Sequence, residues 1–239
     1  MKKIIIFMLV LVMCLSMAGC GGDKDVSGAV SNKKEETNQD DVSGGLEENQ
    51  NDEANQEVDV NLLIGEAEGN TYENAFLGIG FNLPEGWTFY TQEQINALNN
   101  ITQGMLEEDI TEQIQNADLI YDMYALDQYG NSVNVNLEKM SAIAAVGIDE
   151  KTYVEASLEQ IPEALGQMGA TDIEVKATSV QLGGEEHAAL DVSCTSNGVN
   201  IYEKIICIKE GQYMASVTVA TAYENTTDAV LSYFYEVEK

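Results

Sequence analysis

The single histidine and the few cysteines limit the chemistry that this chain could perform. His187 follows Gly183-Gly184-Glu185-Glu186, and a Ser-His-Asp or Cys-His site would need it beside a positioned nucleophile. Strand alternation instead places His187 on the same face as Asp191, away from the neighbouring apolar residues. One histidine and two distant cysteines also lack the ligand spacing of a zinc site. We therefore expect a surface histidine near a strand end, no metal and no cofactor.

Cys194 and Cys207 are the two cysteines that lie beyond the N-terminal region. Asn197-Gly198 is typical of a two-residue hairpin turn, which would place Cys194 opposite Ile201 and Cys207 opposite Ala188. The two sulfur atoms would then lie about 20 Å apart along the ladder, because each residue advances a strand by about 3.3 Å. A disulfide cannot span that distance, so we expect two free thiols that behave as small buried hydrophobes.

Motifs for catalysis by acidic or nucleophilic residues are not identifiable in the sequence. The 41 Asp and Glu residues make chance pairs of carboxylates common, so a glycosidase pair is neither found nor excluded. Ser31-Asn32-Lys33-Lys34 matches the S-x-x-K pattern of penicillin-binding proteins, but it falls in a polar stretch where no helix would position the lysine. The G-x-S-x-G, H-E-x-x-H, phosphate-loop and calcium-loop patterns do not occur.

The chain is strongly acidic, with a formal net charge of −30 from 41 acidic residues and 11 lysines, and it contains no arginine. Clustered cations are needed to displace the counterions of nucleic acids, so we exclude nucleic-acid binding. Bidentate capture of phosphate by guanidinium is impossible, and adhesion to anionic lipid by charge alone is disfavoured. The remaining partners are cationic or neutral ligands, metal ions and proteins with basic patches. The alternative is that the charge only keeps an exported protein soluble.

The first 20 residues have the layout of an export signal. Two lysines precede an apolar run from Ile4 to Met17, and small residues lead to Cys20. The run is too short to span a bilayer stably. The segment resembles the lipobox of bacterial lipoproteins, with Met17 where that family usually has leucine. This resemblance implies removal of residues 1–19, a fatty-acylated Cys20 and anchoring to the cell membrane outside the cytoplasm. The alternative is an ordinary secretory signal with an incidental cysteine.

Residues 20–70 have the composition of a disordered tether. Between Gly21 and Asn70 there are 14 acidic residues and three lysines, and the few apolar residues follow no period. Such a segment cannot bury enough apolar surface to offset its ordering entropy. As a flexible coil its ends would lie about 40 Å apart, which would hold a single globular domain of residues 71–239 away from the membrane. Val58–Ile64 is its one apolar patch, for which a short helix and an added strand both stay open.

The domain of residues 71–239 is predicted to be α+β, with a mainly antiparallel sheet and packed helices. Strands are expected, from alternation and turn residues, at 72–77, 79–83, 87–90, 119–127, 132–140, 173–182, 186–195, 199–209 and 212–221. Helices are expected, from capping residues and apolar spacing, at 92–99, 105–116, 150–168 and 225–235. Thr91-Gln92-Glu93-Gln94 matches a capping box, and Asp149 is the expected N-cap of the longest helix.

Residues 76–87, Phe-Leu-Gly-Ile-Gly-Phe-Asn-Leu-Pro-Glu-Gly-Trp, resemble the opening of the PsbP-like fold. The family order of hairpin, Leu-Pro-x-Gly-Trp turn, helix, further hairpins and C-terminal helix agrees over most of residues 71–239. Members include extrinsic subunits of photosystem II, small periplasmic proteins and lipoproteins, and secretion chaperones. The resemblance therefore implies a PsbP-like fold and a binding or assembly role, and it supplies no catalytic residue.

Two functions stay open from the sequence. The first is a membrane-anchored, extracytoplasmic, non-catalytic binding or assembly module, held to the bilayer through acylated Cys20 and engaging another extracytoplasmic protein or a cell-envelope component. The alternative is an extracytoplasmic hydrolase that uses acidic residues on cell-wall glycan. Tyrosine tolerates a half-buried, hydrated surface, so we expect a contact surface of tyrosines and asparagines, unless the tyrosines are ordinary core-edge residues. The candidates are Tyr90, Tyr121, Tyr124, Tyr129, Asn134 and Asn136.

Overall fold

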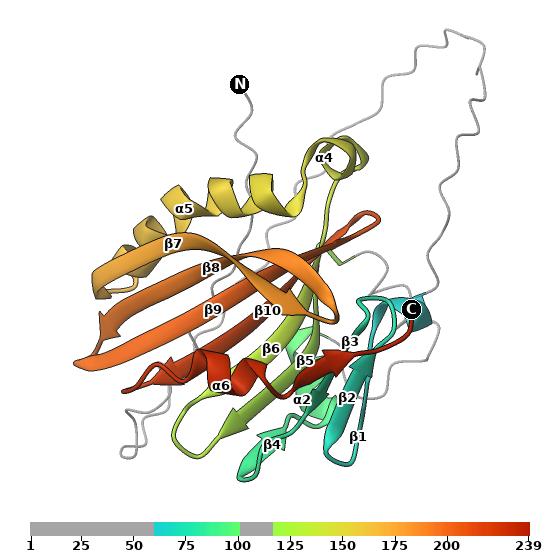
Figure 1. The fold of residues 1–239 in the computed structure, drawn as a ribbon, viewed down its shortest axis with the longest axis horizontal. Coiled ribbons are helices and arrows are strands. Elements are labelled where there is room, and N and C mark those ends of the chain that lie inside the picture. Colours follow the sequence, from blue (N-terminus) through green and yellow to red (C-terminus); the bar gives the residue numbers. More distant parts are fainter. Residues whose placement is uncertain (1–59, 101–116) are drawn as a thin grey trace, which may run out of the picture.

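Two antiparallel β-sheets make up most of the structure, a computed structural model that describes residues 60–100 and 117–239 (Figure 1). The larger sheet has seven strands in the order β4-β5-β6-β10-β9-β8-β7, and the smaller sheet has four in the order β1-β2-β3-β11. The predicted signal, Cys20, residues 20–59 of the predicted tether and the helix predicted at 105–116 lie outside the described residues.

The elements of the described chain have the following bounds. The helices are α1 (Val60–Leu63), α2 (Gln92–Leu98), α4 (Ala142–Gly147), α5 (Glu150–Gln167) and α6 (Thr227–Leu231). The strands of the larger sheet are β4 (Trp87–Phe89), β5 (Leu119–Asp127), β6 (Ser132–Lys139), β7 (Thr171–Leu182), β8 (Glu185–Ser196), β9 (Val199–Glu210) and β10 (Tyr213–Ala222). The strands of the smaller sheet are β1 (Glu66–Glu68), β2 (Thr71–Asn74), β3 (Ile79–Asn82) and β11 (Phe234–Glu236).

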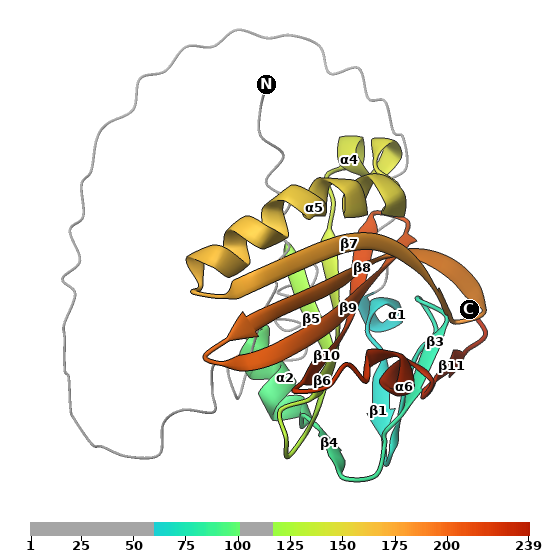
Figure 2. The ribbon, with the colours of Figure 1, turned by 60° about the vertical axis from the view of Figure 1, so that its left-hand side comes forward.

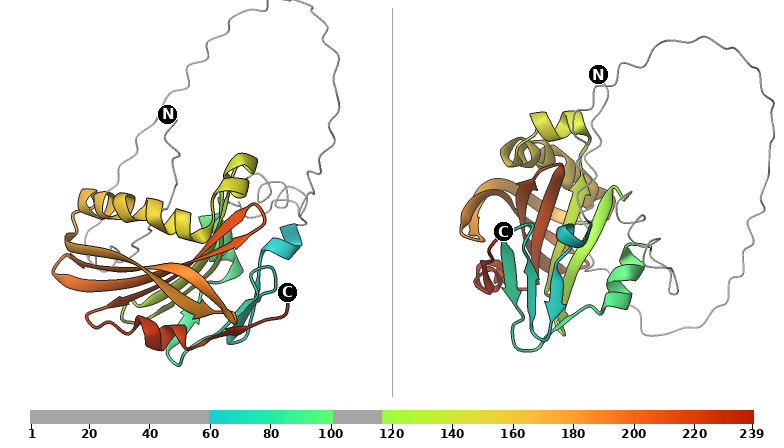
Figure 3. Two further views of the ribbon diagram at one scale, coloured as in Figure 1. Left: turned by 45° about the horizontal axis from the view of Figure 1, so that its top comes forward. Right: turned by 90° about the vertical axis from the view of Figure 1, so that its right-hand side faces the viewer.

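The larger sheet separates two hydrophobic clusters. One face packs against the smaller sheet and α6, in a cluster that includes Phe81, Val135 and Val217. The other face packs against α5, which covers β7, β8 and β9 in a cluster that includes Ile161 and Leu190. Figures 2 and 3 show the resulting layers, with α5 on one side of the larger sheet and the smaller sheet on the other. Successive residues of each strand therefore point to different environments.

The longest helix, α5, begins where its sequence predicts. The Oδ1 atom of Asp149 accepts a hydrogen bond from the backbone N of Thr152 at 2.8 Å, which confirms the expected N-cap. Gly169, just beyond the helix, has a φ of +89°, a conformation that favours glycine. Ile161 and Leu165 are fully buried, so the helical spacing of apolar residues marks the face that packs on the sheet.

The hairpin of β8 and β9 has the register that Asn197-Gly198 predicts. Cys194 pairs with Ile201 across the ladder, and Cys207 lies farther along β9. Both cysteines are buried and free, so the expectation of two unbonded thiols is confirmed. Burial raises the pKa of the Cys207 thiol to about 12, which keeps it protonated and poorly reactive at neutral pH.

The expected α+β class with packed helices, PsbP-like, is wrong, because the structure is rich in sheet. α5 has 18 residues, whereas the other described helices have four to seven. The helix expected at 225–235 ends at Leu231, and Phe234–Glu236 pairs with β3 as β11. Aromatic residues favour strands, and Phe234 packs on Phe81 with ring centroids 4.7 Å apart. A partner strand thus overrides the local helical signal.

The ordered domain includes residues that the sequence assigned to the tether. α1 and β1 precede the first expected strand, and Leu63 is fully buried between the two sheets. Asp122 holds this segment by accepting hydrogen bonds from Gly65 N (2.8 Å), the Tyr72 hydroxyl (2.5 Å) and the Asn74 amide (2.7 Å). A short helix, α1, and a short strand, β1, therefore lie before the expected boundary at residue 70.

Candidate functional site

Most of the candidate contact residues converge on one face of the larger sheet. Tyr121 pairs with Asn136, and Tyr124 pairs with Asn134, across β5 and β6. The register shifts between Tyr121 and Met123, and this bulge places two tyrosines that are three positions apart on the same face. All four side chains therefore lie on the face opposite the smaller sheet.

Tyr90 and Tyr129 lie differently relative to this face. The Tyr90 ring packs against the Tyr124 ring with centroids 4.5 Å apart, and Tyr90 N donates to Tyr124 O at 2.8 Å. Tyr129 lies in the turn between β5 and β6, where it is 65% exposed and its backbone N donates to Asp127. The structure brings Tyr90 to the candidate face and leaves Tyr129 apart from it.

Strand β10 extends the face with two hydroxyl residues, Ser216 and Thr218, that are not among the candidates predicted from the sequence. Ser216 pairs with Asn136, and Thr218 pairs with Asn134. Asn136 Nδ2 also donates to Asn134 Oδ1 at 3.1 Å. The alternation of Ser216 and Thr218 with the apolar Val217 along β10 is the sequence pattern that indicates a polar face on this strand. We define the polar face as Tyr121, Tyr124, Asn134, Asn136, Ser216 and Thr218.

The polar face is held in place by its surroundings. Tyr124 and Asn134 are buried, and Tyr121 and Asn136 are half-buried. Burial raises the pKa of the Tyr121 hydroxyl, which therefore stays protonated and able to donate. The side chain of Asn99, at the end of α2, makes two hydrogen bonds of 2.7 Å to the backbone of Tyr121. This preorganisation favours binding because less conformational entropy is lost.

Glu203 lies on the same side of the sheet, in the row next to the polar face. Strand β9 places it between Ala220 of β10 and Val192 of β8. The residue is 5% exposed, and its Oε2 atom makes no hydrogen bond to any described residue. Burial raises the pKa of this carboxyl to about 7. The sequence signal was an acid at an inward position of β9, between Ile201 and Ile205.

The expectation that His187 lies on the surface is wrong. The residue is 6% exposed, and its Nδ1 lies 2.9 Å from Oε1 of Glu150, the first residue of α5. The Glu150 carboxylate also accepts hydrogen bonds from Lys209 N at 3.0 Å and from Ala188 N at 3.1 Å. Glu150 and His187 are 37 residues apart in the sequence, so strand alternation could not reveal their contact.

The Glu150 carboxylate is inserted at the point where β8 and β9 separate. The last residue pair of the two strands is Ala189 with Ile206. The backbone donors to Glu150, Ala188 N and Lys209 N, lie beyond this pair. Burial alone would raise the pKa of Glu150, but hydrogen bonds from His187 and from the two backbone donors hold it below its ordinary value. An ionised carboxylate only accepts, so His187 Nδ1 carries the proton of this contact. The contact joins α5 to the sheet.

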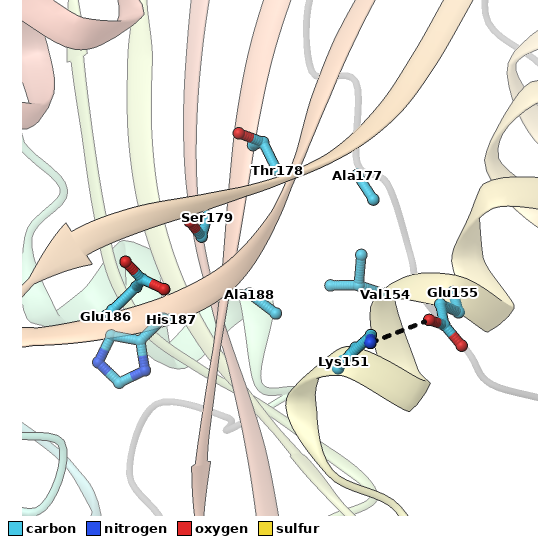
Figure 4. Close-up of a pocket in the computed structure, with 9 residues that line it drawn as sticks. All are labelled: Lys151, Val154, Glu155, Ala177, Thr178, Ser179, Glu186, His187 and Ala188. Carbon is cyan, nitrogen blue, oxygen red and sulfur yellow. Dashed lines mark ion pairs between the residues drawn. The ribbon is translucent and has the colours of Figure 1, made fainter.

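A pocket of about 550 Å³ lies between the start of α5 and the β7–β8 hairpin (Figure 4). Ser179 pairs with Ala188, whereas His187 pairs with Val180, so the hydroxyl and the imidazole start on opposite faces of the hairpin. These two residues therefore do not form a nucleophile–base pair. The pocket is lined by Lys151, Val154, Glu155, Ala177, Thr178, Ser179, Glu186, His187 and Ala188.

The described carboxyl groups with a raised pKa, those of Asp122, Glu138 and Glu203, lie apart from one another. Glu138 is in the same row as Met214 and Lys209, and Lys209 is six positions from Glu203 along β9. That offset corresponds to about 20 Å. Asp122 is bound to the smaller sheet on the other face. Paired carboxyls of glycosidases lie about 5–10 Å apart, so these three do not supply such a pair.

Residues 60–100 and 117–239 contain neither a metal-binding cluster nor a membrane-spanning helix. In these two ranges, no group of three or more His, Cys, Asp or Glu side chains is placed to hold a metal ion. No helix of this part of the chain is both long enough and apolar enough to cross a membrane. Even α5, with 18 residues, carries Lys151, Glu155 and Glu163 along its length.

Comparison with known proteins finds distant likenesses. No family model matches the chain, so the resemblance to the PsbP-like family is unsupported, and no curated protein matches either. LpqN of Mycobacterium tuberculosis, involved in cell envelope biogenesis, is 12% identical with a TM-score of 0.34, over 64% of this chain and 75% of LpqN. PA94 of Pseudomonas aeruginosa, a protein of unknown function, is 13% identical with a TM-score of 0.27, over 38% of this chain and 58% of PA94. At these TM-scores neither structure carries an inference about this protein.

Proposed function

We propose that the protein is a lipid-anchored, extracytoplasmic binding or assembly module that holds its partner on the polar face without turning it over. The observation that carries the proposal is the convergence of tyrosine, asparagine, serine and threonine side chains from three adjacent strands. Amide and hydroxyl groups offer hydrogen bonds in both directions. Tyrosine adds a large contact area at low entropic cost, which suits a hydrated interface.

The location is proposed from the sequence. The layout of residues 1–20 supports export and acylation of Cys20. With the acyl chain in the bilayer, residues 21–59 would tether the domain and raise the effective concentration of partners at the membrane. The net charge of −30 favours a neutral or cationic partner, either an extracytoplasmic protein or a cell-envelope component.

Replacing Cys20 with alanine is expected to abolish fatty-acid labelling of the protein in growing cells. The reason is that Cys20 directly follows the small residues at the end of the signal. Cys14→Ala is the matched control, and it should keep full labelling because Cys14 would leave with the signal. Metabolic labelling followed by gel analysis measures both variants, and equal labelling of the two would refute the assignment.

Replacing Tyr121 with alanine is expected to lower capture of the partner by about tenfold or more, because truncating a buried interface tyrosine commonly has that effect. Tyr129→Ala is the matched control, because Tyr129 is exposed and lies apart from the polar face. Cross-linking of the tagged protein in intact cells and quantitative mass spectrometry measure the capture. Thermal melting of both variants checks the fold. Equal capture by wild type and Tyr121→Ala would remove the polar face from the proposal.

An extracytoplasmic hydrolase of cell-wall glycan is the alternative function. The pocket beside α5 is the place to test it, because Glu155 and Glu186 both line that pocket. If the purified mature chain released soluble fragments from cell walls, and Glu186→Gln abolished the release without lowering the melting temperature, the non-catalytic proposal would be wrong.

A further inference from the structure

Glu203 is a buried carboxyl group with one oxygen atom, Oε2, that no described residue satisfies. The residue is 5% exposed. Apolar side chains surround it, with Val192 beside it on β8 and Ile201 and Ile205 two positions away along β9. An isolated carboxylate is costly to bury, and a bound cation would offset this cost.

The side of Glu203 that faces the polar face carries small and hydrogen-bonding side chains. Across the sheet, Glu203 pairs with Ala220 of β10, which in turn pairs with Ser132 of β6. Thr218 and Asn134 lie two positions away on the same two strands and on the same face. On its other side, β8 and β7 are covered by α5 (Figure 2). The carboxyl group therefore lies at the border between the α5-covered core and the polar face.

Among the described residues, no cationic side chain forms an ion pair with Glu203. Lys204, the next residue of β9, points to the opposite face, where it pairs with Asp191 at 3.2 Å and Asp228 at 2.7 Å. The titratable group close by on the same face is the Cys194 thiol of β8, whose pKa is raised by burial and by the Glu203 charge. From α5, the Tyr153 hydroxyl donates to Glu138 at 2.5 Å, and Glu138 lies about 20 Å from Glu203 along the ladder.

We propose that the polar face binds the ammonium group of a cationic organic ligand, with Glu203 as the counter-ion of that group. This proposal rests on the proposed function and adds a chemical class of ligand to it. Charge complementarity supports it, because the chain has 41 acidic residues, 11 lysines and no arginine of its own. Tyr90 is half-buried and packs on the buried Tyr124, so its ring offers aromatic surface to the hydrocarbon part of a longer ligand.

Binding of such a ligand should strengthen as the pH rises. The pKa of Glu203 is raised by burial to about 7, so the carboxylate fraction increases from about 0.1 at pH 6 to about 0.9 at pH 8. An alkylammonium group stays protonated over this range, as lysine does. The apparent affinity should therefore increase by about tenfold between pH 6 and pH 8.

The test is an NMR titration of the ¹⁵N-labelled mature chain with n-butylammonium, and with 1-butanol as the uncharged probe of similar shape. Butylammonium should shift the amide signals of β9 and β10 around Glu203 in a saturable way, and 1-butanol should not. Glu203→Gln should weaken the binding by at least about tenfold. Glu159→Gln is the matched control at an exposed glutamate of α5, and it should bind as the wild type does. A lysine-containing peptide and spermidine, titrated in parallel, distinguish a protein from a polyamine as the source of the ammonium group.

Several results would overturn the proposal. These are equal binding by Glu203→Gln, equal binding of 1-butanol, and no saturable binding of any of the ammonium probes. The proposed function can fail separately. If Tyr121→Ala abolishes partner capture while Glu203→Gln leaves it intact, the binding module stands and the ammonium site falls. If the ammonium probes bind as predicted but Tyr121→Ala leaves capture unchanged, the site stands and the proposed capture surface falls.

Discussion

Replacing Glu150 with alanine is expected to lower the free energy of unfolding by about 3–5 kcal/mol, because a part-buried carboxylate that accepts from three donors is removed. The Glu150 carboxylate accepts hydrogen bonds from the backbone N–H groups of Ala188 and Lys209 and from Nδ1 of His187. Alanine would leave these donors unpaired at the point where β8 and β9 separate, and each unpaired buried donor costs about 1–3 kcal/mol. Urea unfolding followed by circular dichroism measures the loss.

Glu155→Ala is the matched control for this prediction. Glu155 is on the same helix and its side chain is 60% exposed, so its replacement should change stability by less than about 0.5 kcal/mol. A pH series gives a second readout. Because the folded-state pKa of Glu150 is lowered, its contribution is present above the ordinary value of 4.5 and is lost as the pH falls through the folded value. A loss below about 1 kcal/mol at pH 7 would show that the strands close without this carboxylate.

Replacing Glu203 with glutamine is expected to stabilise the protein by about 3 kcal/mol at pH 8. Burial raises the pKa of Glu203 from 4.5 to about 7, and each unit corresponds to about 1.4 kcal/mol between the two protonation states. The folded state binds the proton more tightly, so wild-type stability falls as the pH rises from 4.5 through 7. Glutamine resembles the protonated side chain and is not subject to this loss.

The gain from Glu203→Gln should therefore be absent at pH 4 and complete by pH 8. Chemical unfolding at several pH values measures it, with Glu186→Gln as the exposed control that shows no such gain. A pH-independent effect of Glu203→Gln would contradict the assigned titration. A stabilising loss of charge would fit a residue kept for ligand binding at the expense of stability.

Local sequence signals predicted those parts of the fold that short segments determine. Asn197-Gly198 fixes the register of the β8–β9 hairpin because a two-residue turn allows one pairing. Thr91 and Asp149 fix two helix starts through side-chain hydrogen bonds to backbone donors three residues ahead. Apolar and polar residues alternate along β6, and this alternation predicts which residues face the smaller sheet. Val135, for example, is buried in the hydrophobic cluster between the two sheets.

Contacts between distant segments account for what the sequence did not reveal. Leu63 looked like part of a polar tether, because its burial depends on a sheet that forms from later residues. Phe234 lies in β11 because β3 offers an edge, although the local pattern favoured a helix. His187 is buried by Glu150, and the bulge of β5 that joins Tyr121 to the polar face depends on the pairing with β6.

The most direct test of binding without turnover is to incubate the mature protein with isolated cell envelopes and to measure retention and fragment release together. We expect the wild type to be retained, Tyr121→Ala to lose retention and Tyr129→Ala to keep it, with no soluble fragments released in any case. Release of glycan or peptide fragments by the wild type, abolished by one Asp or Glu substitution that leaves the melting temperature unchanged, would contradict the account.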